Sequence, residues 1–140
     1  MENFWDKRYA GADYLFGTKP AAGLIALEPH LVAGGKTLVV ADGEGRNSVY
    51  LASRGYDVHA TDYSQVAQKK AKALAKEAGV DVDFVLSDIY DTGWSDQAYD
   101  NVVAIFIQFV PPERMDEIFT ALARATGAGG TLLIHGYTPE

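Results

Sequence analysis

A turn with two glycines, Gly43 and Gly45, is the first feature of the sequence that could bind a ligand. It joins an apolar run, residues 37–40, to a segment with a helical pattern, residues 46–54. The apolar run is typical of a strand buried on both faces of a parallel sheet. A strand that enters a helix through glycines directs backbone N–H groups and a helix N-terminus at one point. That arrangement suits the polar end of a nucleotide-like ligand.

Two aspartates stand where the next two expected strands end, Asp62 after residues 58–61 and Asp88 after residues 82–86. A carboxylate can accept hydrogen bonds from both hydroxyls of a ribose or from the amine of adenine. A dinucleotide fingerprint has glycines spaced G-x-G-x-x-G and an acidic residue ~20 positions later, and here Ser48 stands at the third glycine. The other candidate ligand is S-adenosylmethionine, whose ribose also needs a carboxylate after the second strand. Each aspartate also has a structural alternative, which is to begin the turn that follows it.

The elements that position these residues alternate between helix and strand. Apolar spacing, prolines and glycines predict helices at about residues 3–9, 20–33, 46–54, 65–78 and 112–126, and strands at 37–40, 58–61, 82–86, 101–107 and 131–135. Ser64 is the expected N-cap of the fourth helix and Gly79 its end. The alternation implies an α/β fold with a parallel sheet and helices on both faces. Ligands of such sheets bind beyond the C-terminal ends of the strands.

Composition limits the classes of function. The chain has 140 residues, of which 48% are hydrophobic, a formal net charge of −7 and no cysteine. We expect one domain, residues 1–140, and no nucleic-acid partner, because contact with phosphates needs clustered Lys and Arg. Without a signal peptide or an apolar stretch of membrane-spanning length, we expect a cytoplasmic protein with no membrane partner. The acidic loop at residues 88–93 does not match a calcium site, since Tyr90 stands at a ligand position, and we expect no metal.

Several segments together resemble one family. Residues 43–52, Gly-Glu-Gly-Arg-Asn-Ser-Val-Tyr-Leu-Ala, look like the first motif of class I S-adenosylmethionine-dependent methyltransferases, in particular the tellurite-resistance and thiopurine-methyltransferase-like group. The leader at residues 5–18 and the segments at residues 110–114 and 136–140 are similar to the same group. The resemblance covers essentially the whole chain. It implies a Rossmann-like three-layer α/β sandwich with a mainly parallel sheet in the order 3-2-1-4-5, the cofactor S-adenosylmethionine, the product S-adenosylhomocysteine and a small-molecule acceptor.

The resemblance also assigns roles to residues. The turn would approach the methionine part and the ribose, Asp62 the ribose hydroxyls, and Asp88 with Ile89 the adenine. Residues 1–19 would form an aromatic lid over a core at residues 20–140. Phe106 would lie near the methyl group, and Arg8 would be a partner for the cofactor carboxylate. The cofactor-binding residues expected on this basis are Trp5, Arg8, Tyr14, Ala41, Asp42, Gly43, Gly45, Arg46, Asn47, Asp62, Tyr63, Asp88, Ile89 and Phe106.

The sequence departs from the family pattern in two respects. Val39 stands where the family commonly has an acidic residue, and Ala41 where it commonly has Gly. Asp42 or Glu44 could replace the lost interaction with the ammonium group. The family fold also usually continues past strand five, so we expect a truncated sheet whose apolar strand-five edge is covered in a homo-oligomer.

Methyl transfer needs a general base only if the acceptor loses a proton as it attacks, and His135 is the candidate for that role. Two other functions stay open. One is a non-catalytic module that binds S-adenosylmethionine or a partner. The other is an NAD(P)-dependent oxidoreductase, which Ser48 disfavours.

Overall fold

The structure is a computed structural model that describes residues 4–11, 13–14, 17–90, 94, 98–105, 107 and 110–136, without the side chains of Phe4 and Trp5. Its strands are β1 (Lys36–Val40), β2 (Asp57–Asp62), β3 (Asp83–Leu86), β4 (Tyr99–Ile105) and β5 (Thr126–His135). Its helices are α1 (Phe4–Arg8), α2 (Ala22–Leu27), the 3₁₀ turn η1 (Glu28–His30), α3 (Arg46–Ser53), α4 (Gln65–Ala78) and α5 (Pro112–Ala125). Among the described residues, no helix is both long and apolar enough to cross a membrane.

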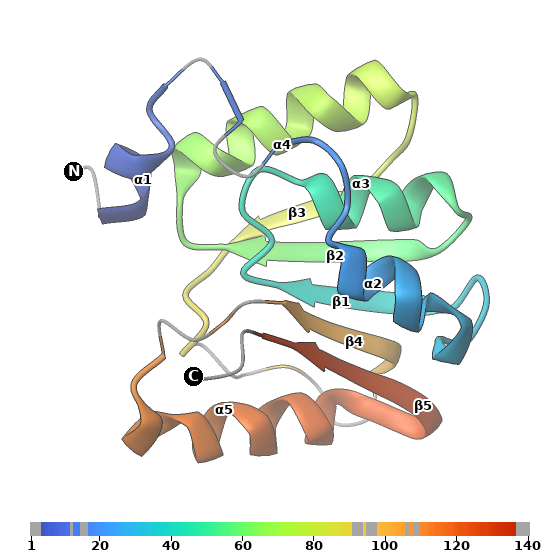
Figure 1. The fold of residues 1–140 in the computed structure, drawn as a ribbon. Coiled ribbons are helices and arrows are strands. Elements are labelled where there is room, and N and C mark those ends of the chain that lie inside the picture. Colours follow the sequence, from blue (N-terminus) through green and yellow to red (C-terminus); the bar gives the residue numbers. More distant parts are fainter. Residues whose placement is uncertain are drawn as a thin grey trace.

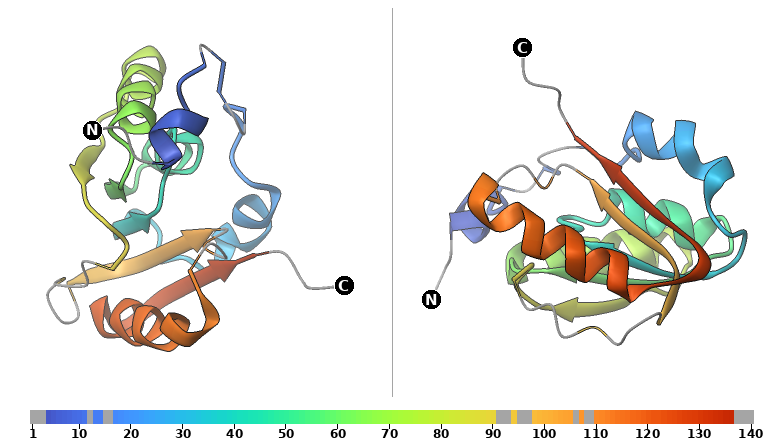
Figure 2. Two further views of the ribbon diagram at one scale, coloured as in Figure 1. Left: turned by 90° about the vertical axis from the view of Figure 1, so that its left-hand side faces the viewer. Right: turned by 90° about the horizontal axis from the view of Figure 1, so that it is seen from below.

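The five strands form one parallel sheet in the order β3-β2-β1-β4-β5, as expected. Helices α2, α3 and α4 lie over one face, and α5 lies over the other, below β4 and β5 (Figure 1). The two views of Figure 2 show the same separation, with α5 seen alone against its face of the sheet. All strand arrows point to the same edge, so the loops that follow β1, β2 and β3 meet there.

Alternation along the strands divides the core into two halves. One half lies beneath α2 and α3 and contains Leu24, Val39, Leu51, Val58, Ala60, Val103, Ile105 and Leu133. The other lies against α5 and contains Leu38, Val40, Val102, Ala104, Ile118 and Leu122. Because β1 and β4 supply both halves, their residues are buried on both faces, which explains why they appear in the sequence as unbroken apolar runs.

Three boundaries differ from the sequence-based expectation. The second helix ends at Leu27, because Pro29 cannot donate to a helical ladder and the chain tightens into η1. The fourth strand begins and ends two residues earlier than expected. β5 begins at Thr126, five residues early, since the register shifts between the pairs Tyr99–Thr126 and Asn101–Thr131. The glycines between these positions permit that irregularity: a side chain on Gly130 would collide with the carbonyl oxygen of Asp100.

Candidate functional site

The turn between β1 and α3 has three residues in the left-handed region. Ala41 has a φ of 51°, Gly43 of 64° and Gly45 of 93°. Gly45 also lies directly against α4, where a Cβ would come within 2.8 Å of the Cβ of Ala71. Ala41 is the one residue other than glycine with a positive φ among the described residues. It therefore takes at a cost the conformation that a glycine would take freely.

Asp42 faces into the protein. Its two carboxylate oxygens accept from the Ser48 backbone N–H at 3.2 Å and from the Ser48 hydroxyl at 2.6 Å. The side chain is buried. Burial, supported by the nearby charge of Asp62, raises the pKa of Asp42 to about 7 against the opposing hydrogen bonds from Ser48. Asp42 thus satisfies the first turn of α3, which is the task of a capping residue.

Asp62 ends β2 at the edge where the loops meet. Its Oδ1 accepts from the backbone N–H of Gly43 at 3.0 Å, and its Oδ2 accepts from that of Ser64 at 2.9 Å. Burial raises the pKa of Asp62 above its ordinary value, with the two backbone donors acting in the opposite direction. Ser64 is the N-cap of α4, as expected, and accepts from Ala67 N–H at 3.0 Å. Asp62 therefore joins the β1–α3 turn to the β2–α4 turn.

Glu44 and Lys70 form an ion pair of 2.8 Å between the glycine turn and α4. The Glu44 side chain is 3% exposed and that of Lys70 17%, so water screens this pair little. Lys70 also donates to the carbonyl oxygen of Asp13 at 2.9 Å, and the Tyr14 hydroxyl donates to the carbonyl oxygen of Lys70 at 3.3 Å. Tyr14 thus contacts α4, and Glu44 is paired with Lys70.

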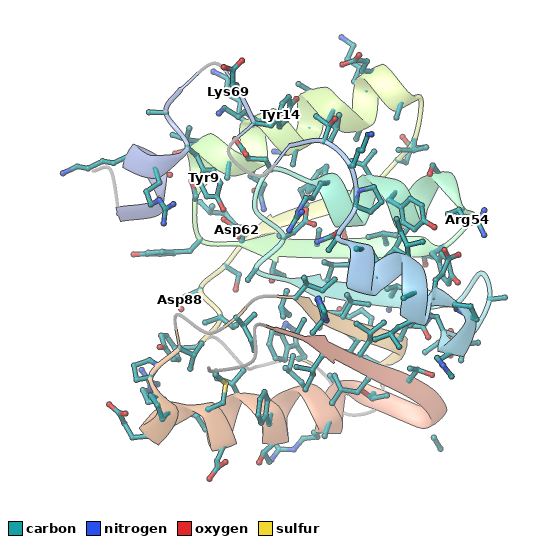
Figure 3. All side chains as sticks on the ribbon, in the orientation of Figure 1. Tyr9, Tyr14, Arg54, Asp62, Lys69 and Asp88 are labelled. Carbon is teal, nitrogen blue, oxygen red and sulfur yellow. The ribbon has the colours of Figure 1, made fainter. Side chains whose placement is uncertain are left out.

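The leader contributes two buried side chains, Asp6 in α1 and Tyr9 directly after that helix. Asp6 accepts from the Ser64 hydroxyl at 2.5 Å and from the Val66 backbone N–H at 3.2 Å. Tyr9 lies over the glycine turn, so that a Cβ on Gly43 would come within 3.0 Å of its hydroxyl oxygen. Burial, with the charges of Asp62 and Glu44, raises the pKa of Tyr9 well above its ordinary value. Figure 3 shows Tyr9 above Asp62 at the edge to which the strands point.

The expected adenine end of the site lies along the same edge. Asp88 accepts from the Tyr90 backbone N–H at 2.9 Å, which is the turn-forming role considered as its structural alternative. The Ile89 side chain is buried in the core beneath this loop. The guanidinium of Arg114, from α5, lies 3.8 Å from the centre of the Tyr90 ring. Asp88 and Asp62 both face this edge in Figure 3, from neighbouring loops.

The remaining candidate residues differ in their burial. Asn47 is buried and accepts from the Ala21 backbone N–H at 2.9 Å, so it ties α3 to the segment before α2. Arg46 is half-buried at the first turn of α3, whereas Arg8 and Tyr63 are exposed, Tyr63 directly beside Asp62. The Phe106 position and the side chain of Trp5 lie outside the described residues.

His135, the candidate base, ends β5 and lies against α2. A Cβ on Gly23 would come within 2.5 Å of its Nε2, so the ring fills the space above that glycine. Among the described residues there is no group of three or more His, Asp or Glu side chains that could hold a metal ion.

The site has the donors and acceptors that an adenosyl ligand requires. Each carboxylate oxygen has two lone-pair directions, so Asp62 can accept from ribose hydroxyls while it keeps its backbone partners. The Tyr63 side chain is 52% exposed beside it and offers a ring to a flat base. The Asp62 carboxylate also favours a ligand with positive charge, whereas Asp42 is directed at Ser48 and Glu44 is neutralised by Lys70. These residues fit S-adenosylmethionine.

Sequence reasoning did not assign Asp6, Tyr9 and Lys70 to the site. Asp6 lies in α1 and Tyr9 directly follows it, and their i, i+3 spacing is typical of residues on one side of a helix. That spacing is a signal in the sequence, but it does not say which loops the helix covers. Lys70 stands among Lys69, Lys72 and Lys76, a pattern typical of a solvated helix face. It is nevertheless half-buried, because it pairs with Glu44 and donates to the carbonyl oxygen of Asp13 in the leader.

The parallel sheet with this strand order and the glycine turn at its edge define a class I methyltransferase fold. A family model described as "Methyltransferase domain" matches residues 38–130, which is well over half of the chain. The chain therefore belongs to the methyltransferase domain family, and that family uses S-adenosylmethionine.

Two curated relatives match along most of the chain. One is the probable S-adenosyl-L-methionine-dependent methyltransferase TehB of Haemophilus influenzae, 25% identical over 95% of this chain and 44% of its own length. Its crystal structure superposes with a TM-score of 0.72. The other is a phosphatidylethanolamine N-methyltransferase of Cereibacter sphaeroides, 29% identical over 91% of this chain and 64% of its own length.

A third similar protein is known from its structure. It comes from work on the conversion of a disulfide bond into a thioacetal group during echinomycin biosynthesis, and it superposes with a TM-score of 0.80. It is 28% identical, over 96% of this chain and 60% of its own. The chain thus spans less than two thirds of each of these relatives.

Proposed function

We propose that this chain binds S-adenosylmethionine at the edge formed by the glycine turn and Asp62, and that it transfers the methyl group to a small-molecule acceptor. The observation that carries the proposal is the Asp62 carboxylate. It stands at the C-terminal end of β2 and is held by the backbone N–H groups of Gly43 and Ser64. A carboxylate in that place, beside a glycine turn, suits the two hydroxyls of a ribose.

When bound, the cofactor supplies an electrophilic methyl group on a sulfonium. The contribution of this chain is to hold two reactants in line, because positioning accounts for a large part of the acceleration of such displacements. Asp62 would fix the ribose, Asp88 and the Ile89 backbone the adenine, and residues 41–45 the methionine part. His135 would accept a proton only from an acceptor that loses one as it attacks.

The test is a calorimetric titration with S-adenosylhomocysteine and, separately, with NADH. We expect the first to bind and the second not to. Asp62→Ala should weaken S-adenosylhomocysteine binding about tenfold or more, as expected for the loss of a charged hydrogen-bonding group. Asp116→Ala removes an exposed carboxylate from α5 and should leave the affinity unchanged. Equal affinities of wild type and Asp62→Ala would remove the ribose assignment.

Activity is tested by turnover of S-adenosylmethionine with a panel of thiols, amines, oxyanions and tellurite. A protein that binds S-adenosylhomocysteine yet turns over none of the panel would favour the non-catalytic alternative. One observation supports that alternative specifically, namely that Ala41 occupies a left-handed position in the turn that should approach the cofactor.

We also propose that the β5 side of the sheet contacts a second copy of the chain. β5 is the last strand in the sheet order, and its Ile134 side chain is 41% exposed. An unpaired edge with exposed apolar side chains tends to associate. Sedimentation velocity at micromolar concentration should show a dimer or larger species that Ile134→Lys dissociates. A purely monomeric wild type would remove this part of the proposal.

A further inference from the structure

Two side chains of the leader, Asp6 in α1 and Tyr9 directly after it, contact the two loops that meet at Asp62. Asp6 is 6% exposed and accepts from the side chain of Ser64 in the β2–α4 turn and from the backbone N–H of Val66 in the first turn of α4. Tyr9 is also 6% exposed and lies over Gly43 in the β1–α3 turn. Asp62 itself links the same two turns through Ser64 and Gly43. The leader thus contacts the same two turns that the central carboxylate joins (Figure 3).

A continuous set of hydrogen bonds leads from the leader to the glycine turn. The Ser64 hydroxyl donates to Asp6 at 2.5 Å, the Ser64 backbone N–H donates to Asp62 at 2.9 Å, and the Gly43 N–H donates to Asp62 at 3.0 Å. Ser64 links the two sides, because its side chain donates to Asp6 of the leader and its backbone N–H donates to Asp62. A change in the position of Ser64 must therefore alter its hydrogen bond to the Asp62 carboxylate.

We propose that Asp6 is a positioning residue for the cofactor site: by holding Ser64 it fixes the Asp62 carboxylate in the orientation that receives a ribose. The inference rests on the proposed function of Asp62 and goes beyond it, because it assigns affinity for the adenosyl ligand to a residue of the leader. Asp6 does not touch the ligand in this proposal. It acts through the Ser64–Asp62 hydrogen bond.

A capping role alone would not require this arrangement. Ser64 already caps α4 by accepting from Ala67 N–H, and Asp6 adds a second acceptor for Val66 N–H in the same turn. If Asp6 only stabilised α4, its removal would loosen the first turn of that helix and would leave Gly43 unaffected. If it positions Asp62, its removal also loosens the hydrogen bond from Gly43.

The binding test compares three variants by titration with S-adenosylhomocysteine. Asp6→Ala removes both hydrogen bonds and should weaken binding about tenfold, the effect expected for one hydrogen bond to a charged group. Asp6→Asn keeps an oxygen acceptor for Ser64 and Val66 and should stay within about twofold of wild type. Asp100→Ala is the matched control. It removes a carboxylate that accepts from the Lys36 backbone N–H at 2.9 Å, at the opposite edge of the sheet, and should bind like wild type.

A double-mutant cycle tests the route of the effect. Ser64→Ala removes the donor that Asp6 accepts from, so Asp6→Ala should add little in the Ser64→Ala background. Full additivity of the two losses would overturn the proposed route through Ser64.

The second readout needs no ligand. Amide hydrogen exchange resolved by residue should show faster exchange at Gly43 and Ser64 in Asp6→Ala than in wild type, with recovery in Asp6→Asn. Unchanged exchange at Gly43, or a loss of affinity in Asp100→Ala equal to that in Asp6→Ala, would overturn the inference. A wild type that does not bind S-adenosylhomocysteine would remove the proposed function instead, and the exchange at Gly43 would then decide by itself whether Asp6 positions Asp62.

Discussion

The substitution Asp42→Asn tests the electrostatics of the glycine turn directly. The Asp42 side chain is buried and accepts hydrogen bonds from the backbone N–H and the hydroxyl of Ser48. An amide has nearly the same shape as the carboxylate and cannot ionise. Its oxygen can accept from the Ser48 N–H and its nitrogen can donate to the Ser48 hydroxyl, whose own hydrogen can turn to the Gly45 carbonyl oxygen 3.3 Å away. The variant should therefore keep the fold of the turn.

The magnitude follows from the pKa of Asp42. Burial raises it to about 7 in the folded protein, against an ordinary value of 3.8. Between these two values the folded protein holds a proton that the unfolded chain has released. This proton contributes about 4 kcal/mol to the free energy of unfolding below about pH 4, and the contribution is lost as the pH rises through about 7. The asparagine of Asp42→Asn cannot ionise, so the variant does not lose this stability as the pH rises.

The assay is urea unfolding, followed by circular dichroism, from pH 4.5 to pH 8.5. The free energy of unfolding of Asp42→Asn minus that of wild type should increase with pH and level off above pH 7, at a value of about 3 to 4 kcal/mol. Because other groups titrate in both proteins, the difference isolates Asp42. Asp116→Asn, at an exposed position in α5, is the control and should differ from wild type by a small constant amount. A difference that does not change with pH for Asp42→Asn would refute the assignment of a raised pKa to this carboxyl.

Two further substitutions test the backbone of the turn. Ala41→Gly should raise the free energy of unfolding by up to about 1 kcal/mol, since relief of a left-handed conformation outweighs the larger entropy of glycine in the unfolded chain. Thermal unfolding measures this change, and a melting temperature below that of wild type would contradict the reasoning. Gly45→Ala should lower the free energy of unfolding by about 3 kcal/mol or more, because the new Cβ adds overlap with Ala71 of α4 to an unfavourable φ of 93°. Gly79→Ala, with a φ of 70° and no atom within 4 Å of the new Cβ, should cost only about 1 kcal/mol, and equal losses in the two variants would show that the contact with α4 does not matter.

Much of the architecture follows from local sequence. Within the described residues, the alternation of apolar runs with helical spacing predicted the five strands and the α-helices near their observed places, and the Ser64 cap and the Gly79 end of α4 are where the sequence predicts them. These features are local, because a cap satisfies the N–H groups of its own helix and a glycine relieves its own φ. The start of β5 was placed wrongly, since its bulge depends on pairing with β4, which is distant in sequence.

The resemblance to a family indicated the roles of Asp62 and the glycine turn, and the structure supplies the physical reason for their proximity. Parallel strands end at one edge, so β1 and β2 bring the Gly43 N–H to the Asp62 carboxylate across 19 positions of sequence. The individual residue types could not show that Glu44 is paired with Lys70, or that Asp42 is directed at Ser48. Each of these partners depends on how α3 and α4 are placed on the sheet.

The fold class, the glycine turn and the acidic residues at the strand ends could be predicted from the sequence, because periodicity, backbone freedom and charge are properties of short segments. The packing of the helices on the sheet separates the acidic residues that face the site from those whose partners lie within the protein. It also placed Asp6 and Tyr9 of the leader on the turns around Asp62. The hydrogen bond between Ser64 and Asp6 joins residues 58 positions apart, so it depends on the packing of whole elements and cannot be predicted from a local sequence pattern.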